Sequence, residues 1–340
     1  MQMPIKFFIP GHDNKRPTRA SFRFRATIPL EGMRPEDGII SDVKQAKKDD
    51  IVVLAKKSKP IDLFYLKSQG IKTVYDICDN RWRKYVSDDW IKRVIEPHNT
   101  ICEGVDNIVT TSPKMRELIM KHIGKNSIII PDPVEAIREE PRVALKSKSC
   151  INIFNYGNHK HFQKVRWNEF MQLLFDTEFN IKVHCMLDRA KKFRIMYKDE
   201  IDTGRLIIYD YDYHKQYELM RMCDIVFLPI VCNSMANVND LRSKSPNRII
   251  DAIQSGKPVI TNEGVDSWLP FRGYADFIGF SRSFDYVAQI QALRSLINRP
   301  KAEIVNKILK GQEYIKEHHS PEVIGKMWID LENKVGKLGF

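Results

Sequence analysis

Residues 244–261 read KSPNRIIDAIQSGKPVIT, and this pattern predicts a loop, a helix, a tight turn and a strand. Ser245 is a favourable helix N-cap, and Pro246 suits the first helical position. Three isoleucines recur at helical spacing and form one apolar face: Ile249, Ile250 and Ile253. Gly256 is a natural helix stop, so the PVIT that follows is expected to be a short buried strand.

The start of this helix has the features of an anion site. Its first N–H groups have no partner within the helix, and Lys244 adds a positive charge beside them. Asp251 lies one turn further in, on the same side as Asn247 and Arg248. A diphosphate bound at the helix start would place an attached ribose within reach of Asp251. The alternative is an ordinary capped helix with an Arg248–Asp251 surface pair, which this stretch alone favours.

The composition is that of a globular protein large enough for two domains: 340 residues, 43% hydrophobic and 29% charged. No apolar run approaches the roughly 18 residues of a membrane span. The N-terminal stretch MQMPIKFFIPGHDN lacks the pattern of a signal peptide. The six cysteines form no CxxC pair or metal-ligand spacing, which predicts reduced thiols in a cytoplasmic protein.

The formal net charge is +12, and the densest basic cluster is KRPTRASFRFR at 15–25. Its cations alternate with Phe22 and Phe24. Such a face suits an anionic partner: nucleic acid, an anionic membrane surface or a phosphorylated substrate. The alternative is charge that serves solubility only.

Short apolar runs alternate with helical patterns along the whole chain, which predicts βαβ units and mostly parallel sheets. The first series has strands at 5–10, 50–57, 72–79, 106–112 and 127–134, and helices at 36–48, 60–70, 82–95 and 113–123. The polar stretch 135–149 is expected to be a linker or the lip of a second domain.

The second series has strands at 151–157, 181–187, 205–211, 224–230, 257–261 and 275–280, and helices at 165–176, 189–198, 214–223, 246–255 and 284–297. The tail is predicted to form helices at 301–316 and 321–337, with His318 and His319 as a solvated helix end. We expect two doubly wound α/β domains facing across a cleft, with ligands at the strand C-termini.

Several stretches follow one another in a familiar order: DNIVTTSPKMRELI (106–119), SIIIPDPVE (127–135), INIFNYGNHKH (151–161), RLIIYDYDYHKQYELMRMCDIVFLPI (205–230) and the segment 244–261. With them the chain resembles the GT-B glycosyltransferases, and most of all their retaining families that use nucleotide-sugars. The resemblance implies a Rossmann-like acceptor domain at 1–135 and a Rossmann-like nucleotide-sugar domain at 136–320. It also implies a C-terminal helix at 321–340 that packs back on the first domain. A nucleoside-diphosphate sugar is then the co-substrate, with no cofactor and no required metal.

One departure from the family concerns its two glutamates, which many retaining members carry eight positions apart. Asp251 stands at the second position, and Ser243 replaces the first acid, which often contacts the donor sugar. Lys244 and the SPN turn replace a glycine-rich stretch.

Sugar transfer develops negative charge on the departing diphosphate, which nearby cations stabilise. We expect Lys244 and Arg248 to serve this role. Gly157 would allow close approach of the backbone, and Tyr211 and Tyr213 lie where the family reads the base, although plain packing explains the tyrosines equally well. The full set expected to bind the donor nucleotide is Gly157, Asn158, Lys160, Lys164, Tyr211, Tyr213, Ser245, Asn247 and Asp251.

The acceptor side is expected after the strands of the first domain. Asp79 could orient an acceptor hydroxyl or act as its base, or it could be a loop acid that caps the next helix. The residues expected to bind the acceptor are Ser21, Arg23, Arg25, Asp76 and Asn80. The two arginines could instead hold the donor phosphates.

Other motifs argue against three further classes of enzyme: GT-A glycosyltransferases, kinases and dehydrogenases. The DxD inside YDYDY (209–213) is a weak signal, because GT-A enzymes that use it lack two Rossmann-like halves. Walker A and GxGxxG patterns are absent, which argues against a kinase or a dehydrogenase.

The sequence therefore predicts a glycosyltransferase whose acceptor is a cell-envelope glycan or its lipid-linked precursor, in the cytoplasm or peripheral at the inner membrane face. One alternative is a phage-type enzyme that glycosylates a hydroxymethylated base in DNA. Others are a sugar-nucleotide epimerase and a non-catalytic nucleotide-binding protein.

Overall fold

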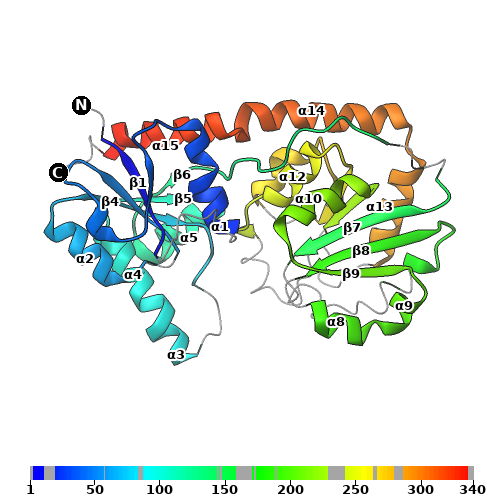
Figure 1. The fold of residues 1–340 in the computed structure, drawn as a ribbon, viewed down its shortest axis with the longest axis horizontal. Coiled ribbons are helices and arrows are strands. Elements are labelled where there is room, and N and C mark those ends of the chain that lie inside the picture. The colour runs from blue at the N-terminus through cyan, green and yellow to red at the C-terminus, as the bar shows by residue number, and fades with distance from the viewer. Residues whose placement is uncertain are drawn as a thin grey trace. The chain divides into compact units, whose positions relative to one another are not determined.

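A computed structural model describes residues 3–10, 20–56, 58–82, 87–143, 145, 148–157, 171, 174–187, 190–228, 242–262, 266–278 and 286–335. The chain divides into two compact units (Figure 1). Unit 1 comprises Met1–Glu135, Asn239–Asn247 and Lys316–Phe340. Unit 2 comprises Ala136–Val238 and Arg248–Ile315. Each unit is built on its own parallel sheet.

The sheet of unit 1 has the strand order β2-β1-β3-β4-β5-β6, and all its neighbouring strands are parallel. Its strands are β1 (Ile5–Phe8), β2 (Gly38–Ile40), β3 (Ile51–Leu54), β4 (Lys72–Ile77), β5 (Asn107–Thr110) and β6 (Ile128–Ile129). This is a doubly wound order whose direction reverses between β1 and β3. Ligands of such sheets bind beyond the strand C-termini at that reversal.

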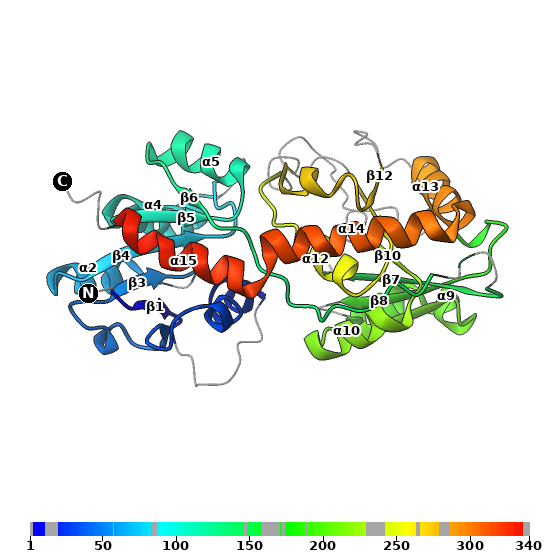
Figure 2. The ribbon, with the colours of Figure 1, turned by 90° about the horizontal axis from the view of Figure 1, so that it is seen from above.

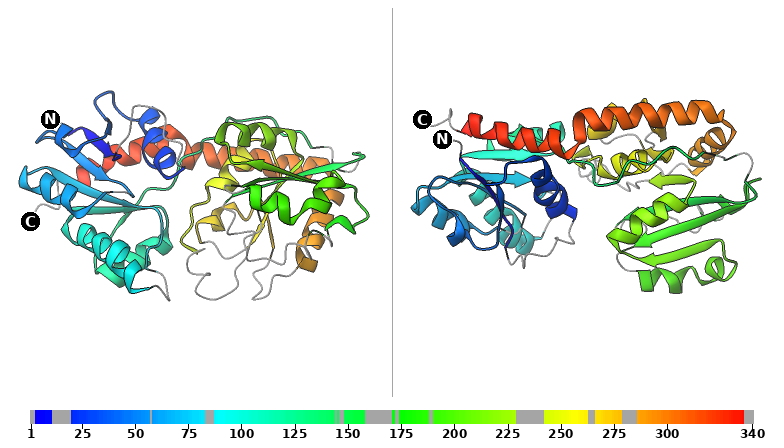
Figure 3. Two further views of the ribbon diagram at one scale, coloured as in Figure 1. Left: turned by 60° about the horizontal axis from the view of Figure 1, so that its bottom comes forward. Right: turned by 45° about the horizontal axis from the view of Figure 1, so that its top comes forward.

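Helices cover both faces of this sheet (Figure 3). They are α1 (Ala20–Phe22) with a π turn (Arg23–Thr27), α2 (Pro60–Ser68), α3 (Asp88–Trp90) with a π turn (Ile91–Ile95), α4 (Glu96–Gly104), α5 (Pro113–Ile123) and α15 (Pro321–Val335), with 3-10 turns at Pro29–Gly32 and Val43–Gln45. Strand β3 is buried throughout, and its side chains alternate between two cores. Val52 and Leu54 pack with Leu63 of α2, whereas Ile51 and Val53 pack in the core that contains Trp328 of α15.

The C-terminal helix α15 is part of the core of unit 1, along its sheet (Figure 2). The Trp328 ring meets Phe7 edge-on, with 5.0 Å between centroids. The helix comes close because two glycines meet: a Cβ on Gly325 would lie 2.5 Å from the carbonyl carbon of Gly32. This packing of the C-terminal helix on the N-terminal part confirms the resemblance-based prediction.

The sheet of unit 2 has the order β12-β11-β10-β7-β8-β9, again with parallel neighbours. Its strands are β7 (Ile151–Gly157), β8 (Ile181–Leu187), β9 (Leu206–Asp210), β10 (Ile225–Leu228), β11 (Val259–Asn262) and β12 (Asp276–Ile278). Counted from β7, this is the classical dinucleotide-binding order, and the direction reverses between β7 and β10.

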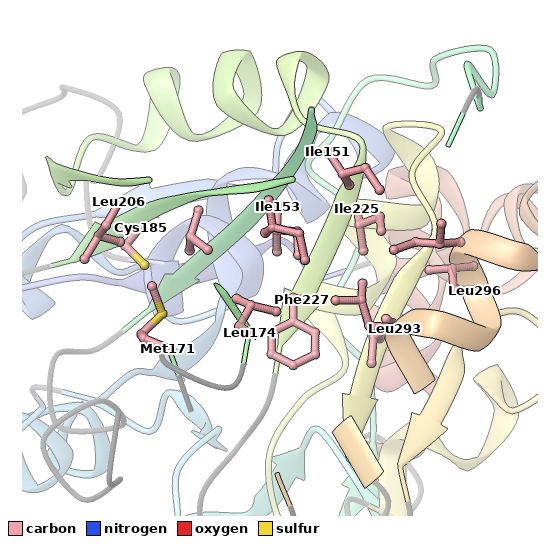
Figure 4. Close-up of a cluster of buried hydrophobic side chains, with 14 of the residues drawn as sticks. Ile151, Ile153, Met171, Leu174, Cys185, Leu206, Ile225, Phe227, Leu293 and Leu296 are labelled. Atoms are coloured by element: carbon pink, nitrogen blue, oxygen red, sulfur yellow. The ribbon is translucent and has the colours of Figure 1, made fainter. Parts of the chain in front are cut away.

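The helices of unit 2 are α8 (Ala190–Met196), α9 (Lys198–Asp202), α10 (Tyr213–Met222), α12 (Asn247–Gln254), α13 (Tyr286–Asn298) and α14 (Lys301–His319), with a 3-10 turn at Asp266–Phe271. Asn247 and the last residues of α14 belong to unit 1. Figure 4 shows a buried cluster in which Ile153 of β7 and Phe227 of β10 lie with Leu293 of α13. No helix in the described part of the chain is long and apolar enough to cross a membrane.

Three segments differ from the sequence prediction. The helix predicted at 36–48 is wrong: Gly38–Ile40 pairs with β1, because two isoleucines with β-branched side chains fit an edge strand. The strand predicted at 127–134 is only two residues long, since prolines follow it and donate no ladder hydrogen bonds. The helix predicted at 82–95 begins at Asp88 within the described residues and continues through a π turn into α4.

The prediction of a solvated His319 is also wrong. Its side chain is 6% exposed, and its Nδ1 lies 2.8 Å from the carbonyl oxygen of Asp132. The His319 carbonyl accepts from the Val134 amide at 2.7 Å. The end of α14 is therefore tied to the segment that follows β6.

Candidate functional site

In unit 2, Arg248 joins the first turn of α12 to the end of β7. Its Nη1 donates to the Tyr156 carbonyl at 3.1 Å, and the Tyr156 hydroxyl donates to the Arg248 carbonyl at 3.3 Å. A Cβ on Gly157 would lie 3.1 Å from Nη1, and Gly157 has a φ of +150°. Glycine at this position therefore lets the backbone approach the guanidinium.

The Arg248 guanidinium is partly buried, and no carboxylate contacts it among the residues that the structure describes. Burial lowers the pKa of Arg248, because removal from water disfavours the charged form. A cation placed in this way gains most from an anionic partner. It lies beside β7, where the strand order of unit 2 reverses. The predicted phosphate-loop residues Asn158, Lys160 and Lys164 lie outside the described residues.

Asp251, one turn further along α12, is 2% exposed and makes internal contacts. Its Oδ1 accepts from the Ala136 amide at 3.1 Å, and its Oδ2 accepts from the Tyr217 hydroxyl at 3.2 Å. The structure therefore does not contain the Arg248–Asp251 surface pair of the alternative interpretation. Contact of Asp251 with a ribose stays a prediction.

The YDYDY stretch follows β9 and leads into α10. Tyr211 is 40% exposed, and Tyr213 stacks at a tilt on His214 with 3.8 Å between ring centroids. The two acids have structural partners: Asp210 pairs with Arg194 at 2.7 Å, and Asp212 caps α10. Base recognition by the tyrosines stays a prediction.

In unit 1, Asp79 accepts from two lysines that are distant in sequence. The Nζ of Lys244 lies 3.0 Å from Oδ1, and Lys56, which follows β3, donates to Oδ2. Burial alone would raise the pKa of Asp79, but Lys244 and Lys56 hold it well below its usual range. Such a carboxylate is a weak base, so the arrangement favours an anchor for the lysines over a proton acceptor.

The loop before α12 is fixed in unit 1 at Ser243, where many of the retaining glycosyltransferases that the sequence resembles carry an acid. Ser243 is 1% exposed, and its carbonyl accepts from the Ser112 hydroxyl at 3.5 Å. Ser112 also caps α5. Ser245 and Asn247 are half-buried at the start of α12.

The predicted acceptor residues Arg25 and Asp76 lie in a buried ion network. Arg25 Nη2 is 2.8 Å from Asp76 Oδ1, and Arg25 Nη1 is 3.1 Å from Asp132 Oδ1. Burial lowers the pKa of Arg25, but the two carboxylates more than offset this and raise it above its usual value. Burial raises the pKa of Asp76, and Arg25 partly opposes that rise.

The other predicted acceptor residues are also largely occupied within the protein. Arg23 makes a bidentate pair with Glu135, with 2.7 Å from Nε to Oε1 and 2.9 Å from Nη2 to Oε2. Asn80 is 6% exposed and accepts from the Trp82 amide at 3.0 Å. Ser21 is half-buried in α1. The sequence reasoning missed Lys56, although its place just after a strand could have indicated it.

In the described part of the chain, no three His, Cys, Asp or Glu side chains are grouped to hold a metal ion. The expectation that activity requires no metal stays a prediction.

The two strand orders, together with α15 packed into unit 1, define the class of fold. The chain has the GT-B fold, the fold of the glycosyltransferases that the sequence resembles. HepE of Anabaena, in complex with UDP and glucose, aligns with a TM-score of 0.67 over 97% of this chain and 99% of its own, at 10% identity. WaaG, a glycosyltransferase involved in lipopolysaccharide biosynthesis, aligns with a TM-score of 0.62 over 95% and 99%, at 12% identity.

TarM of S. aureus also aligns, with a TM-score of 0.62 and 15% identity, over 85% of this chain and 56% of its own. In sequence, the chain is 26% identical over 212 residues to a viral protein, the "Putative glycosyltransferase ORF31" of a virus isolated in Victoria, Australia. That match covers 57% of this chain and 64% of the viral protein, so the chain spans less than two thirds of that relative. No family model matches the chain.

Proposed function

We propose that this chain is a glycosyltransferase that moves a sugar from a nucleoside-diphosphate sugar to an acceptor hydroxyl, with retention at the anomeric carbon. The observation that carries the proposal is Arg248, a partly buried cation with no carboxylate partner among the described residues, beside Gly157 and the strand reversal of unit 2. The fold shared with HepE, whose structure holds UDP and glucose, supports it.

In this reaction the bond from the anomeric carbon to the diphosphate breaks, and its electron pair leaves with the diphosphate. The acceptor oxygen bonds to the anomeric carbon, and its proton passes to an oxygen of the departing diphosphate. Arg248 and the N–H groups at the start of α12 stabilise the departing charge, and Lys244 adds a further cation. Gly157, Asn158, Lys160 and Lys164 complete the phosphate loop in this proposal, and Tyr211 contacts the base.

For the acceptor, we propose a cell-envelope glycan or its lipid-linked precursor, met in the cytoplasm at the inner membrane face. The net charge of +12 and the fold shared with WaaG, a protein of lipopolysaccharide biosynthesis, support this choice. A hydroxymethylated DNA base is the second candidate, which the viral relative favours. Steeply salt-dependent binding to a DNA duplex would select DNA, and binding to anionic vesicles would select the envelope.

The test is calorimetric titration of the full chain with UDP, GDP, ADP, CDP and dTDP. Arg248→Gln should weaken binding of the preferred nucleotide about tenfold or more, because a charge-assisted hydrogen bond to phosphate is lost. Arg248→Lys should recover part of the affinity. The control is Arg294→Gln, which removes an exposed ion pair with Glu178 in the same unit. Absence of binding by any of the five nucleotides would overturn the proposal, and binding without sugar transfer would indicate a non-catalytic binder.

A further inference from the structure

Unit 1 carries a compact cationic cluster that includes Lys244 of the proposed donor site and a second lysine, Lys56, that the donor site does not use. Lys56 and Lys244 both contact the Asp79 carboxylate, and Arg81 Nη2 donates to the Lys56 carbonyl at 2.8 Å. These residues come from three separate segments: the end of β3, the end of β4 and the loop before α12. The fold therefore brings two lysines to one acid, and Arg81 holds the backbone of one of these lysines.

The cluster lies where a doubly wound sheet binds ligands. Lys56 comes two residues after β3, and Asp79 comes two residues after β4, the strand beside β3. Strand order in unit 1 reverses between β1 and β3. Lys56 is thus at the C-terminal edge next to the reversal, the place where such sheets hold their ligands.

The acids of this edge have different partners among the described residues. The buried Arg25 is shared by Asp76 and Asp132, while Asp79 contacts Lys56 and Lys244. The lysines are the most exposed part of the network: the side chains of Lys56 and Lys244 are 40% and 38% exposed, that of Asp79 is 29% exposed, and those of Asp76 and Asp132 are 4% and 6% exposed. Solvent at this edge therefore meets two ammonium groups and the single carboxylate between them.

We propose that Lys56 and Lys244, held apart by Asp79, form a phosphate-binding subsite of unit 1. The Lys56 ammonium carries three N–H donors, of which Asp79 takes one, and Lys244 lies against the same carboxylate. A carboxylate between two lysines fixes their positions in advance, which lowers the entropy cost of binding an anion. The place of this subsite in the reaction rests on the proposed function: the phosphate belongs to the acceptor or to the diphosphate of the donor.

The test compares phosphorylated and uncharged probes on the full chain by calorimetric titration: sn-glycerol 3-phosphate against glycerol, and UDP against uridine. Lys56→Gln should lower the affinity for one of the two phosphorylated probes about tenfold, and Lys56→Arg should keep most of that affinity. Lys59→Gln is the matched control, because Lys59 is an exposed lysine of the same loop. Neither uncharged probe should respond to any of these variants.

Each outcome assigns the subsite or overturns it. Loss of affinity for glycerol phosphate alone assigns it to a phosphorylated acceptor, and loss for UDP alone assigns it to the donor. Equal affinity of Lys56→Gln and wild type for both probes overturns the subsite, even if Arg248→Gln abolishes nucleotide binding. If Lys56 governs glycerol phosphate binding while no nucleotide binds, the subsite stands and the transferase proposal fails.

Discussion

Arg25 and Asp76 form an ion pair, 2.8 Å from Nη2 to Oδ1, in which both side chains are almost completely buried. The pair joins the π turn after α1 to the end of β4, and Asp132 extends it to the segment after β6. The sequence predicts that both residues bind the acceptor. In the structure they serve first to hold three segments of unit 1 together.

Replacement of Arg25 by methionine should destabilise unit 1 by about 3–5 kcal/mol, because two buried carboxylates lose their cation. Urea unfolding followed by tryptophan fluorescence measures the change. The control is Arg93→Met, which removes an exposed pair with Asp89 and should cost about 0.5 kcal/mol or less. Similar stability of the two variants would show that the buried network contributes little.

His98 should make the stability of unit 1 depend on pH. It is 3% exposed beside the Tyr75 hydroxyl, and burial, with the charge of Arg81, lowers its pKa to about 3. The unfolded chain therefore binds the proton first, so this contribution is full above about pH 6.5 and is lost as the pH falls toward 3. We expect a loss of about 2 kcal/mol between pH 7.5 and pH 5. His98→Asn should remove that part of the slope in urea titrations, and an unchanged slope would contradict the assignment.

The contact of Gly32 with Gly325 should tolerate no side chain. A Cβ on Gly32 would lie 2.3 Å from the Pro321 carbonyl oxygen, so Gly32→Ala must displace α15. We expect a loss of about 1–3 kcal/mol of unfolding free energy, measured by thermal or urea unfolding. Gly38→Ala is the control within the same unit, because no atom lies within 4 Å of its added Cβ. A Gly32→Ala protein as stable as the control would refute the close backbone approach.

Asp251→Asn separates a structural role from a ribose contact. The substitution keeps the side-chain shape but turns one acceptor into a donor opposite the Ala136 amide or the Tyr217 hydroxyl, which should cost about 1–3 kcal/mol of stability. Tyr217→Phe removes one of these partners and should cost about 1 kcal/mol. If UDP affinity falls in Asp251→Asn but not in Tyr217→Phe, Asp251 contacts the ligand. If UDP affinity is unchanged in both variants, the role of Asp251 is structural only.

Much of the fold follows from sequence periodicity, because a buried parallel strand needs a run such as IVVL at 51–54 and a capped helix needs ends such as Ser112 and Gly124. Strand β2 escaped prediction since its three residues become a strand only by pairing with β1. The ion-pair partners of charged residues were harder to predict than the strands and helices. Arg23 and Arg25 look like free cations in the sequence, and only the fold brings Glu135 and Asp132 to them.

The same limit applies to the candidate site. Gly157 and Arg248 were both predicted, and the structure places them in contact across 91 residues of chain. Lys56 was not predicted, because its partner Asp79 follows a different strand and no local pattern joins the two. Such a pair depends on β3 and β4 being neighbours in the sheet, which the local sequence pattern does not show.

The share of α15 in the core of unit 1 has a consequence for synthesis on the ribosome. Ile324, Trp328 and Leu331 pack with Ile5 and Phe7, so β1 lacks part of its core until α15 has been translated. Until then, one face of the sheet of unit 1 stays partly uncovered. Nascent chains stalled just before α15 should therefore depend strongly on chaperones, although they already contain every described strand of both sheets.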